Sequence, residues 1–161
     1  MSVARADVQQ HLRRLLSEES RLLAELQSVL ERETGIVSGD DADAIARIGS
    51  NRHHCIDALS RLGVERDDTS RMLSFGTDQA GLNRMFDWAD PSQALRRRWS
   101  SNLELARRCK ALNDRNGAIV AAKLDRVQQL LRNLRGTDAP AVYSAKASRY
   151  APFAPRDLGR A

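Results

Sequence analysis

The feature that most constrains this chain is a long segment whose inward positions alternate three and four residues apart. It runs from about residue 91 to residue 135, and its apolar seam includes a pair of asparagines three residues apart, Asn113 and Asn116. A helix of that length extends about 65 Å at ~1.5 Å per residue, so it must lie against another long helix or a partner chain. The pattern predicts an elongated protein whose large surface suits binding better than catalysis. The seam consists of Leu95, Trp99, Asn102, Ala106, Cys109, Asn113, Asn116, Val120, Lys123, Val127, Leu131 and Leu134.

A second amphipathic pattern predicts a helix over Val3–Thr34. Its inward stripe alternates four and three residues, and a flanking row of leucines recurs every seven. The face is therefore wide enough for a three- or four-helix core. Gly35 follows the last periodic residue and is typical of a C-terminal stop. The stripe comprises Val8, Leu12, Leu15, Glu19, Leu22, Leu26, Val29 and Glu33, and the flanking row is Leu16, Leu23 and Leu30.

A third pattern predicts a helix over Ala42–Leu62 that is capped by Asp41 or Asp43 and ended by Gly63. Arg52 occupies a position on its inward face where a further apolar residue would fall. Residues Ser38 to Asp43 form a polar link between it and the first helix.

The stretch 64–90 is interrupted by two glycines and predicts one or two short helices, the second near Thr77–Trp88. Asp90 and Pro91 resemble a helix start, since Asp accepts from exposed N–H groups and Pro at the first helical position loses nothing. We therefore expect the long helix to begin there and Gly136 to end it.

Beyond residue 136 the composition changes, with Pro140, Pro152 and Pro155 among small and polar residues. Such a segment is expected to be disordered when unbound. Its spaced apolar residues are typical of segments that fold on binding: Tyr143, Tyr150, Phe153 and Leu158. Together the patterns predict an all-α fold, an elongated up-down helical bundle or antiparallel long-helix coiled coil of three main helices. The bundle domain would span 1–136 and a flexible C-terminal tail 137–161.

The net charge of +5 is spread unevenly, because residues 92–135 hold eleven basic and three acidic side chains. One interpretation is a nucleic-acid-binding or regulatory helical protein that uses this basic helix. The other is the solvated outer face of a long helix, partly neutralised by the acidic segment 36–91. Trp99 lies on the seam and is expected to pack rather than to stack on a base. An affinity for nucleic acid that falls steeply with salt would favour the first interpretation.

Catalytic and metal chemistry find little support in the residues. The sequence has no G-x-S-x-G, P-loop or dinucleotide motif, so no enzyme and no cofactor are expected. His53, His54 and Cys55 are adjacent, but consecutive helical residues point about 100° apart and cannot easily share one ion. Cys55 and Cys109 are expected to be free and buried. No apolar run reaches membrane-spanning length and no signal peptide is evident, so we expect a cytoplasmic protein without stable membrane insertion.

The inward asparagines allow two interpretations. A buried Asn is costly unless paired, and paired asparagines can fix the register and partner number of a bundle. Alternatively, Asn113 and Asn116 could bond the backbone of a docked helix, with Gly117 permitting its close approach.

A run of features in one order resembles a known family. The run is Asn113-Asp-Arg-Asn116-Gly117-Ala-Ile119-Val120, then Leu131-Arg-Asn-Leu134-Arg-Gly136, then Tyr143. This order, together with the opening helix Leu12–Glu33, resembles the FlgN family of flagellar export chaperones over about residues 8–147. The chain departs from the family pattern at Ser144, where Asp is usual, and at Ala147, where Gly is expected.

The resemblance implies a cytosolic chaperone that binds hook-associated (hook–filament junction) proteins through their C-terminal helices and delivers them to the flagellar export gate. It implies no nucleic-acid partner. We expect Leu95–Cys109 to pack on the N-terminal helix and the client to contact Ile119–Tyr143. An uncovered apolar stripe could also be hidden in a weak homodimer. The expected partner-binding residues are Asn113, Asn116, Gly117, Ile119, Val120, Val127, Leu130, Leu131, Leu134 and Tyr143.

Overall fold

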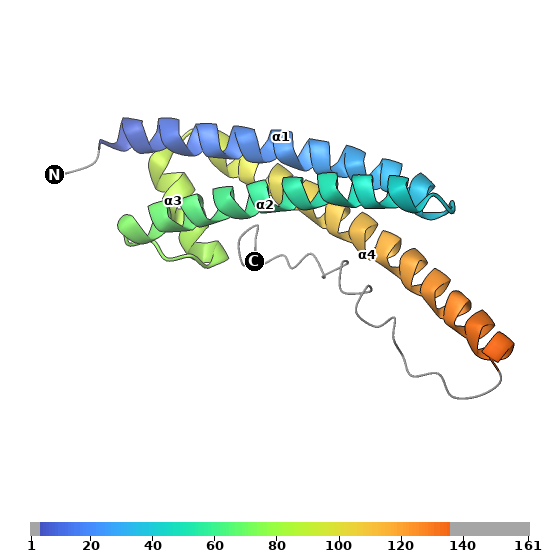
Figure 1. Ribbon diagram of the computed structural model, residues 1–161. Coiled ribbons are helices and arrows are strands. Elements are labelled where there is room, and N and C mark those ends of the chain that lie inside the picture. Colours follow the sequence, from blue (N-terminus) through green and yellow to red (C-terminus); the bar gives the residue numbers. More distant parts are fainter. Residues whose placement is uncertain (1–3, 136–161) are drawn as a thin grey trace.

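Three long helices and one short helix make up the described part of the chain. The computed structural model describes residues 4–135, which contain α1 (Arg5–Val37), α2 (Ala42–Met72), α3 (Gln79–Ala89) and α4 (Ala94–Arg135) and no strand. The long helices lie lengthwise along one another, and α3 lies at the end of the bundle near the N-terminus (Figure 1). The predicted all-α, elongated up-down bundle is confirmed.

Helix α1 is the centre of the bundle, because both α2 and α4 pack against it. Its rows of apolar residues are buried on both sides, and each fully buried Leu contributes roughly 1.5–3 kcal/mol. Helix α2 runs antiparallel to α1, whereas α4 runs parallel to it. The parallel direction is evident from two hydrogen bonds, Asn102 to Leu16 and Asn116 to Leu30, which span the same sequence separation of 86 residues.

The apolar core has two clusters along the bundle. The first lies at the α3 end, where Leu12 and Leu16 of α1 meet Phe86 of α3 and Trp99 of α4. The second lies further along and joins α1, α2 and α4 through Leu26, Leu59 and Cys109 among others. Both cysteines are buried free thiols, as expected. The expected packing of Leu95–Cys109 on the N-terminal helix is confirmed by the α4 members of these clusters.

Two glycines that were expected to end helices do not. Helix α1 continues through Gly35, around which a methyl group would meet nothing, and Val37 is completely buried two residues later. Helix α2 continues through the buried Gly63 to Met72. Its last two turns bury polar side chains, so the apolar periodicity fades while the helix persists. Asp41 caps α2 as predicted, with Oδ1 accepting from the Ala44 amide at 2.9 Å.

The connection between α2 and α4 contains the single short helix, α3, close to the expected position. The long helix does not begin at Pro91, however, but at Ala94, after a turn in which Gln93 has a φ of 62°. Asp90 still serves the helix start, because its Oδ2 accepts from the Leu95 amide at 3.1 Å. Its pKa is lowered chiefly by the hydrogen bond from the Ser92 hydroxyl. The expected stop at Gly136 and the tail 137–161 lie outside the described residues.

Candidate functional site

A cluster of buried polar side chains joins the three long helices near the middle of α1. Asn102 donates from Nδ2 to the Leu16 carbonyl at 3.0 Å and to Glu19 Oε2 at 2.8 Å. Its Oδ1 accepts from the Ser20 hydroxyl at 2.6 Å. Arg66 of α2 donates to Glu19 Oε1 at 2.9 Å. We call Glu19, Ser20, Arg66 and Asn102 the proximal polar layer.

The same arrangement recurs further along the bundle. Asn116 donates from Nδ2 to the Leu30 carbonyl at 3.0 Å and to Glu33 Oε2 at 3.1 Å. Its Oδ1 accepts from the Thr34 hydroxyl at 2.7 Å, and Arg52 of α2 donates to Glu33. On α1 and α4 each member has a residue number fourteen higher than its counterpart in the proximal layer. On the antiparallel α2 the number is fourteen lower. We call Glu33, Thr34, Arg52 and Asn116 the distal polar layer.

An apolar layer separates the two polar layers. Cys109 lies seven residues from both asparagines, and its thiol contacts the Leu23 carbonyl at 3.5 Å, again over 86 residues of sequence. Leu26 and Leu59 occupy the positions that the carboxylate and the guanidinium take in the polar layers. Burial raises the pKa of the Cys109 thiol to about 12, so this thiol stays protonated and behaves as a small hydrophobic group.

The charged groups of the polar layers lose their hydration on burial, so they must be paired with well-placed partners. Burial raises the pKa of the Glu19 carboxyl, and the charge of Arg66 and the hydrogen bond from Asn102 oppose that shift. Paired buried charges add little net stability, but removing one partner leaves an uncompensated charge. A shift of α4 along α1 would separate these buried partners and cost free energy. The layers therefore support the interpretation that inward asparagines fix the register of the bundle.

The two layers differ at one seam position of α4. In the proximal layer the guanidinium of Arg66 lies 4.4 Å from the centre of the Trp99 ring. This is a cation–π contact. Fourteen residues further along α4, the corresponding seam position is Asn113. Trp99 is buried and also packs on Phe86, which confirms that it packs within the bundle.

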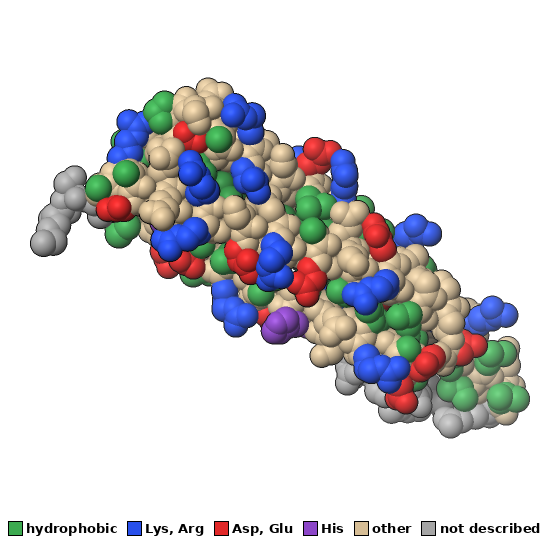
Figure 2. Space-filling model, turned by 90° about the horizontal axis from the view of Figure 1, so that it is seen from above, with side chains coloured by type: hydrophobic (Ala, Val, Ile, Leu, Met, Phe, Trp, Pro, Cys, Tyr) green, Lys and Arg blue, Asp and Glu red, His purple; other side chains and the backbone are tan. Residues whose placement is uncertain are grey.

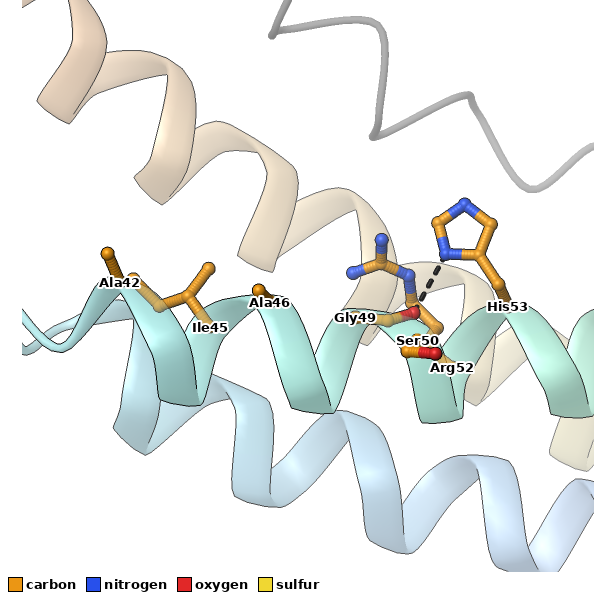
Figure 3. A pocket seen from close by; sticks show the side chains of 7 residues that line it. All are labelled: Ala42, Ile45, Ala46, Gly49, Ser50, Arg52 and His53. Carbon is orange, nitrogen blue, oxygen red and sulfur yellow. Dashed lines mark hydrogen bonds between the residues drawn. The ribbon is translucent and has the colours of Figure 1, made fainter.

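A pocket of about 430 Å³ opens beside the distal layer, on the first turns of α2. Most of the side chains that line it are small, and Arg52 and His53 supply the larger polar groups (Figure 3). We call it the α2 pocket, and its lining residues are Ala42, Ile45, Ala46, Gly49, Ser50, Arg52 and His53.

The end of α4 extends beyond the helices that cover the rest of its seam (Figure 1). Lys123 is the last α4 residue with a polar contact to the α1–α2 link, where it bonds the Gly39 carbonyl and lies 3.5 Å from Asp40. Beyond it three large apolar side chains are exposed, with exposed fractions of 51% for Val127, 55% for Leu130 and 83% for Leu134. We call residues 124–134 the projecting segment of α4.

The surface view shows the same contrast. Hydrophobic side chains gather at the end of the molecule where α4 projects, while basic and acidic side chains are interspersed over the remainder of this face (Figure 2). Several basic residues of α4 are paired locally, for example Arg108 with Glu104 at 2.6 Å and Lys110 with Asp114 at 2.6 Å. These pairs match the solvated-face interpretation of the basic helix.

The expected partner-binding residues fall into different environments. Asn116 is completely buried and already bonded to α1, and Asn113 is 5% exposed. Gly117, Ile119, Val120 and Leu131 are half-buried, whereas Val127, Leu130 and Leu134 are exposed. Tyr143 lies outside the described residues. Their role in partner binding remains a prediction, although the structure already gives Asn116 a partner within the chain.

Sequence reasoning missed part of the polar layers. The predicted helix 42–62 does not include Arg66, and Ser20 and Thr34 are not among the residues expected on the inward stripe of the first helix. A signal was present in the spacing, since Leu-x-x-Glu-(Ser/Thr) occurs twice in α1 and Gly-x-x-Arg twice in α2, each time fourteen residues apart. Such matched spacing on separate helices indicates side chains that meet in layers.

Other chemistry is not evident in the described part of the chain. Among residues 4–135 no group of three or more His, Cys, Asp or Glu side chains could hold a metal ion. No helix within those residues is long and apolar enough to cross a membrane.

Comparison with known proteins identifies one family. The family model described as FlgN protein matches residues 1–150, which is most of the chain. No curated protein and no solved structure matches it.

Proposed function

The chain belongs to the FlgN family of flagellar export chaperones, and on that premise we propose that it binds hook-associated proteins before their secretion. The proposed complex forms in the cytoplasm, and the chaperone then delivers its client to the export gate. The family is one of chaperones, so the expected activity is binding without catalysis.

The observation that carries this proposal is the projecting segment of α4. Its seam continues the heptad spacing of the bundle but has no α1 residues to cover it, because α1 ends at Val37. Val127, Leu130 and Leu134 are exposed on this face. An amphipathic helix binds such a stripe with its own apolar face, as in other helix-in-groove complexes.

The energetics suit a reversible complex. Burial of a large apolar side chain contributes roughly 1.5–3 kcal/mol, so several partly exposed residues can supply a useful share of a binding free energy. Part of that gain is lost in ordering the client and immobilising two molecules. A chaperone that must release its client at the export gate needs affinity of this moderate kind.

The test uses the full chain and a purified hook-associated protein. Replacement of Val127, Leu130 and Leu134 by Asp should abolish the complex in calorimetric titration. A matched variant carries Asp at Ala118, Ala122 and Gln129, which are exposed on the outward face of α4 and should leave binding unchanged. Equal loss of binding in both variants would contradict the proposed contact, because the effect would then follow charge rather than position.

A second test separates the client from self-association. The weak homodimer would cover the same residues, so light scattering of the free chain should show a larger mass at high concentration that the aspartate variant lacks. Client binding should compete with that association. Client binding that leaves the dimer intact would remove the projecting segment from the proposed site.

A further inference from the structure

The α2 pocket and the projecting segment of α4 lie at the same end of the bundle. Arg52 of the pocket lining and Asn116 of α4 both bond to Glu33, which places the pocket beside the distal polar layer. One layer further along, Lys123 contacts the α1–α2 link, and the projecting segment begins directly after it. The lining side chains extend from α2 away from α1 (Figure 3), and α4 separates from the other long helices towards its end (Figure 1).

The two surfaces are complementary in shape. The pocket has a volume of about 430 Å³, and Ala42, Ala46 and Gly49 in its lining allow another helix to approach α2 closely. The projecting segment carries the opposite kind of side chain, because its exposed apolar residues are large. Small residues that face large ones let two packed helices interdigitate. The large exposed residues are Val127, Leu130 and Leu134.

The two surfaces also carry opposite charges. Residues 38–46 hold three aspartates and no basic residue, whereas residues 124–135 hold three basic residues and one acidic residue. All three aspartates are exposed. Within the chain, Lys123 of α4 lies 3.5 Å from Asp40, so the acidic link already attracts a basic group of this helix. Arg126 and Arg132 are exposed on the part of α4 that continues away from the link.

One molecule cannot join these two surfaces by itself. The pocket extends from the link back along the bundle, whereas the projecting segment continues α4 in the outward direction. From Lys123 to Leu134 the helix advances about 16 Å at ~1.5 Å per residue. Two copies related by a two-fold axis can join both pairs of surfaces at once, because each copy supplies one pocket and one projecting segment.

We propose that the α2 pocket receives the projecting segment of a second copy of this chain, in a reciprocal two-fold dimer. Val127, Leu130 and Leu134 of each copy would pack against the small residues of the partner's α2, and the arginines of the segment would face the partner's aspartates. Specific interfaces bury about 1,200–2,000 Å² in total, and a closed dimer approaches this because the same contact forms twice.

The dimer would regulate the client site, and this part of the inference rests on the proposed function. The residues that would contact a client helix are the ones that the second copy covers. The client-free chaperone would therefore hide its largest exposed apolar side chains in the dimer. A client has to compete with the second copy, so its binding should convert dimers into complexes that contain one chaperone chain.

The first experiment mixes two full-length variants, Ala46→Cys and Leu130→Cys, and links their thiols with a bismaleimide. Both native cysteines are buried and should not react. The mixture should give a product at dimer mass that joins residues 46 and 130. Its yield should be roughly tenfold above that of a mixture of Asn51→Cys and Leu130→Cys, the change that corresponds to ~1.4 kcal/mol. Asn51 is the matched control, because it is exposed on α2 outside the pocket lining.

A second experiment reverses charges and leaves the apolar surface intact. Sedimentation at low salt should show that Asp43→Arg and Arg126→Asp each raise the Kd of the dimer by roughly tenfold. The double variant should recover most of that loss, because the reversed charges would face each other in both contacts. Asp7→Arg is the control and should leave the Kd unchanged. Asp7, like Asp43, is an exposed aspartate in the first turn of a helix, but it lies at the opposite end of the bundle.

Each other outcome overturns a defined part of the proposal. A chain that stays monomeric at every attainable concentration, or equal crosslink yields in the two mixtures, would exclude the reciprocal dimer. A double charge variant that is no tighter than the single variants would exclude the pairing of arginines with aspartates. A hook-associated protein that binds without reducing the crosslink would exclude competition. If no such protein binds, the proposed function fails, while the client-free crosslink still decides the occupant of the pocket.

Discussion

Asn102 and Asn116 make the same three hydrogen bonds to α1, fourteen residues apart. Each donates to a carbonyl 86 residues earlier in sequence and to a glutamate 83 residues earlier, and each accepts from a hydroxyl 82 residues earlier. This equality means that α1 and α4 keep one register over four helical turns. The asparagines thus define how far the end of α4 projects beyond α1.

Replacement of Asn116 by Ala should destabilise the protein. The substitution leaves the buried Leu30 carbonyl and the Glu33 carboxylate without their amide donor, a loss of about 1–3 kcal/mol. Urea denaturation followed by circular dichroism measures it. Asp114→Ala on the same turn removes only an exposed pair with Lys110 and should change stability by less than about 1 kcal/mol. Similar losses in both variants would refute a special role for the buried amide.

The proximal ion pair should behave non-additively. Arg66→Met leaves Glu19 charged in a buried site and should cost about 3–5 kcal/mol. The double replacement of Glu19 and Arg66 by Met removes both charges and should cost clearly less than the single change. The free energy of unfolding of the wild type, the two single variants and the double variant gives the coupling. A double variant less stable than Arg66→Met would show that the charges themselves hold the helices together.

The Cys109 thiol should be inert in the native state. Its folded pKa is raised to about 12 from the ordinary value of 9.0, first by burial, so the native protein binds a proton more tightly than the unfolded chain. This thiol's contribution to stability is therefore complete below pH 9 and is lost as the pH rises towards 12. At pH 8.5 iodoacetamide should modify Cys109 at the rate of global unfolding. Rapid modification without denaturant would contradict the buried position.

Two glycines should respond to alanine with opposite signs. A Cβ on Gly81 would lie 2.3 Å from the Phe75 carbonyl oxygen and 2.8 Å from that of Gly76, so Gly81→Ala must displace backbone. We expect a loss of at least about 1–3 kcal/mol, as for other overpacked sites. Gly35→Ala meets nothing and should stabilise α1 by about 0.5–1 kcal/mol through helix propensity. Thermal unfolding of both variants checks the pair.

Apolar periodicity predicted the three long helices, the short helix near Thr77–Trp88 and the seam of α4, because burial of leucine rows dominates those choices. It misplaced the end of α2, where the inward residues Arg66, Thr69 and Ser70 are polar. The helix persists there because tertiary partners satisfy those groups, for example Glu19 for Arg66. Hydropathy alone does not encode such pairing.

The candidate site was predicted in part. The inward position of Asn113 and Asn116 followed from the heptad spacing, but the residue of α4 beyond which α1 no longer covers the seam did not. It depends on where α1 ends, and the expected stop at Gly35 does not occur. The contact of Trp99 with Arg66 was not predicted, because the expected end at Gly63 left Arg66 outside the predicted helix 42–62.

The parallel pairing of the first and last helices also has a consequence for how the protein is made. The ion pairs between α1 and α2 join residues 19 and 47 positions apart, whereas the amides of α4 bond to α1 over more than 80. During synthesis the hairpin of α1 and α2 can therefore neutralise its glutamates before α4 leaves the ribosome. The nascent chain would first form a charge-balanced hairpin whose α4-facing side is exposed. Asn102 and Asn116 would make their hydrogen bonds to α1 last, when α4 packs.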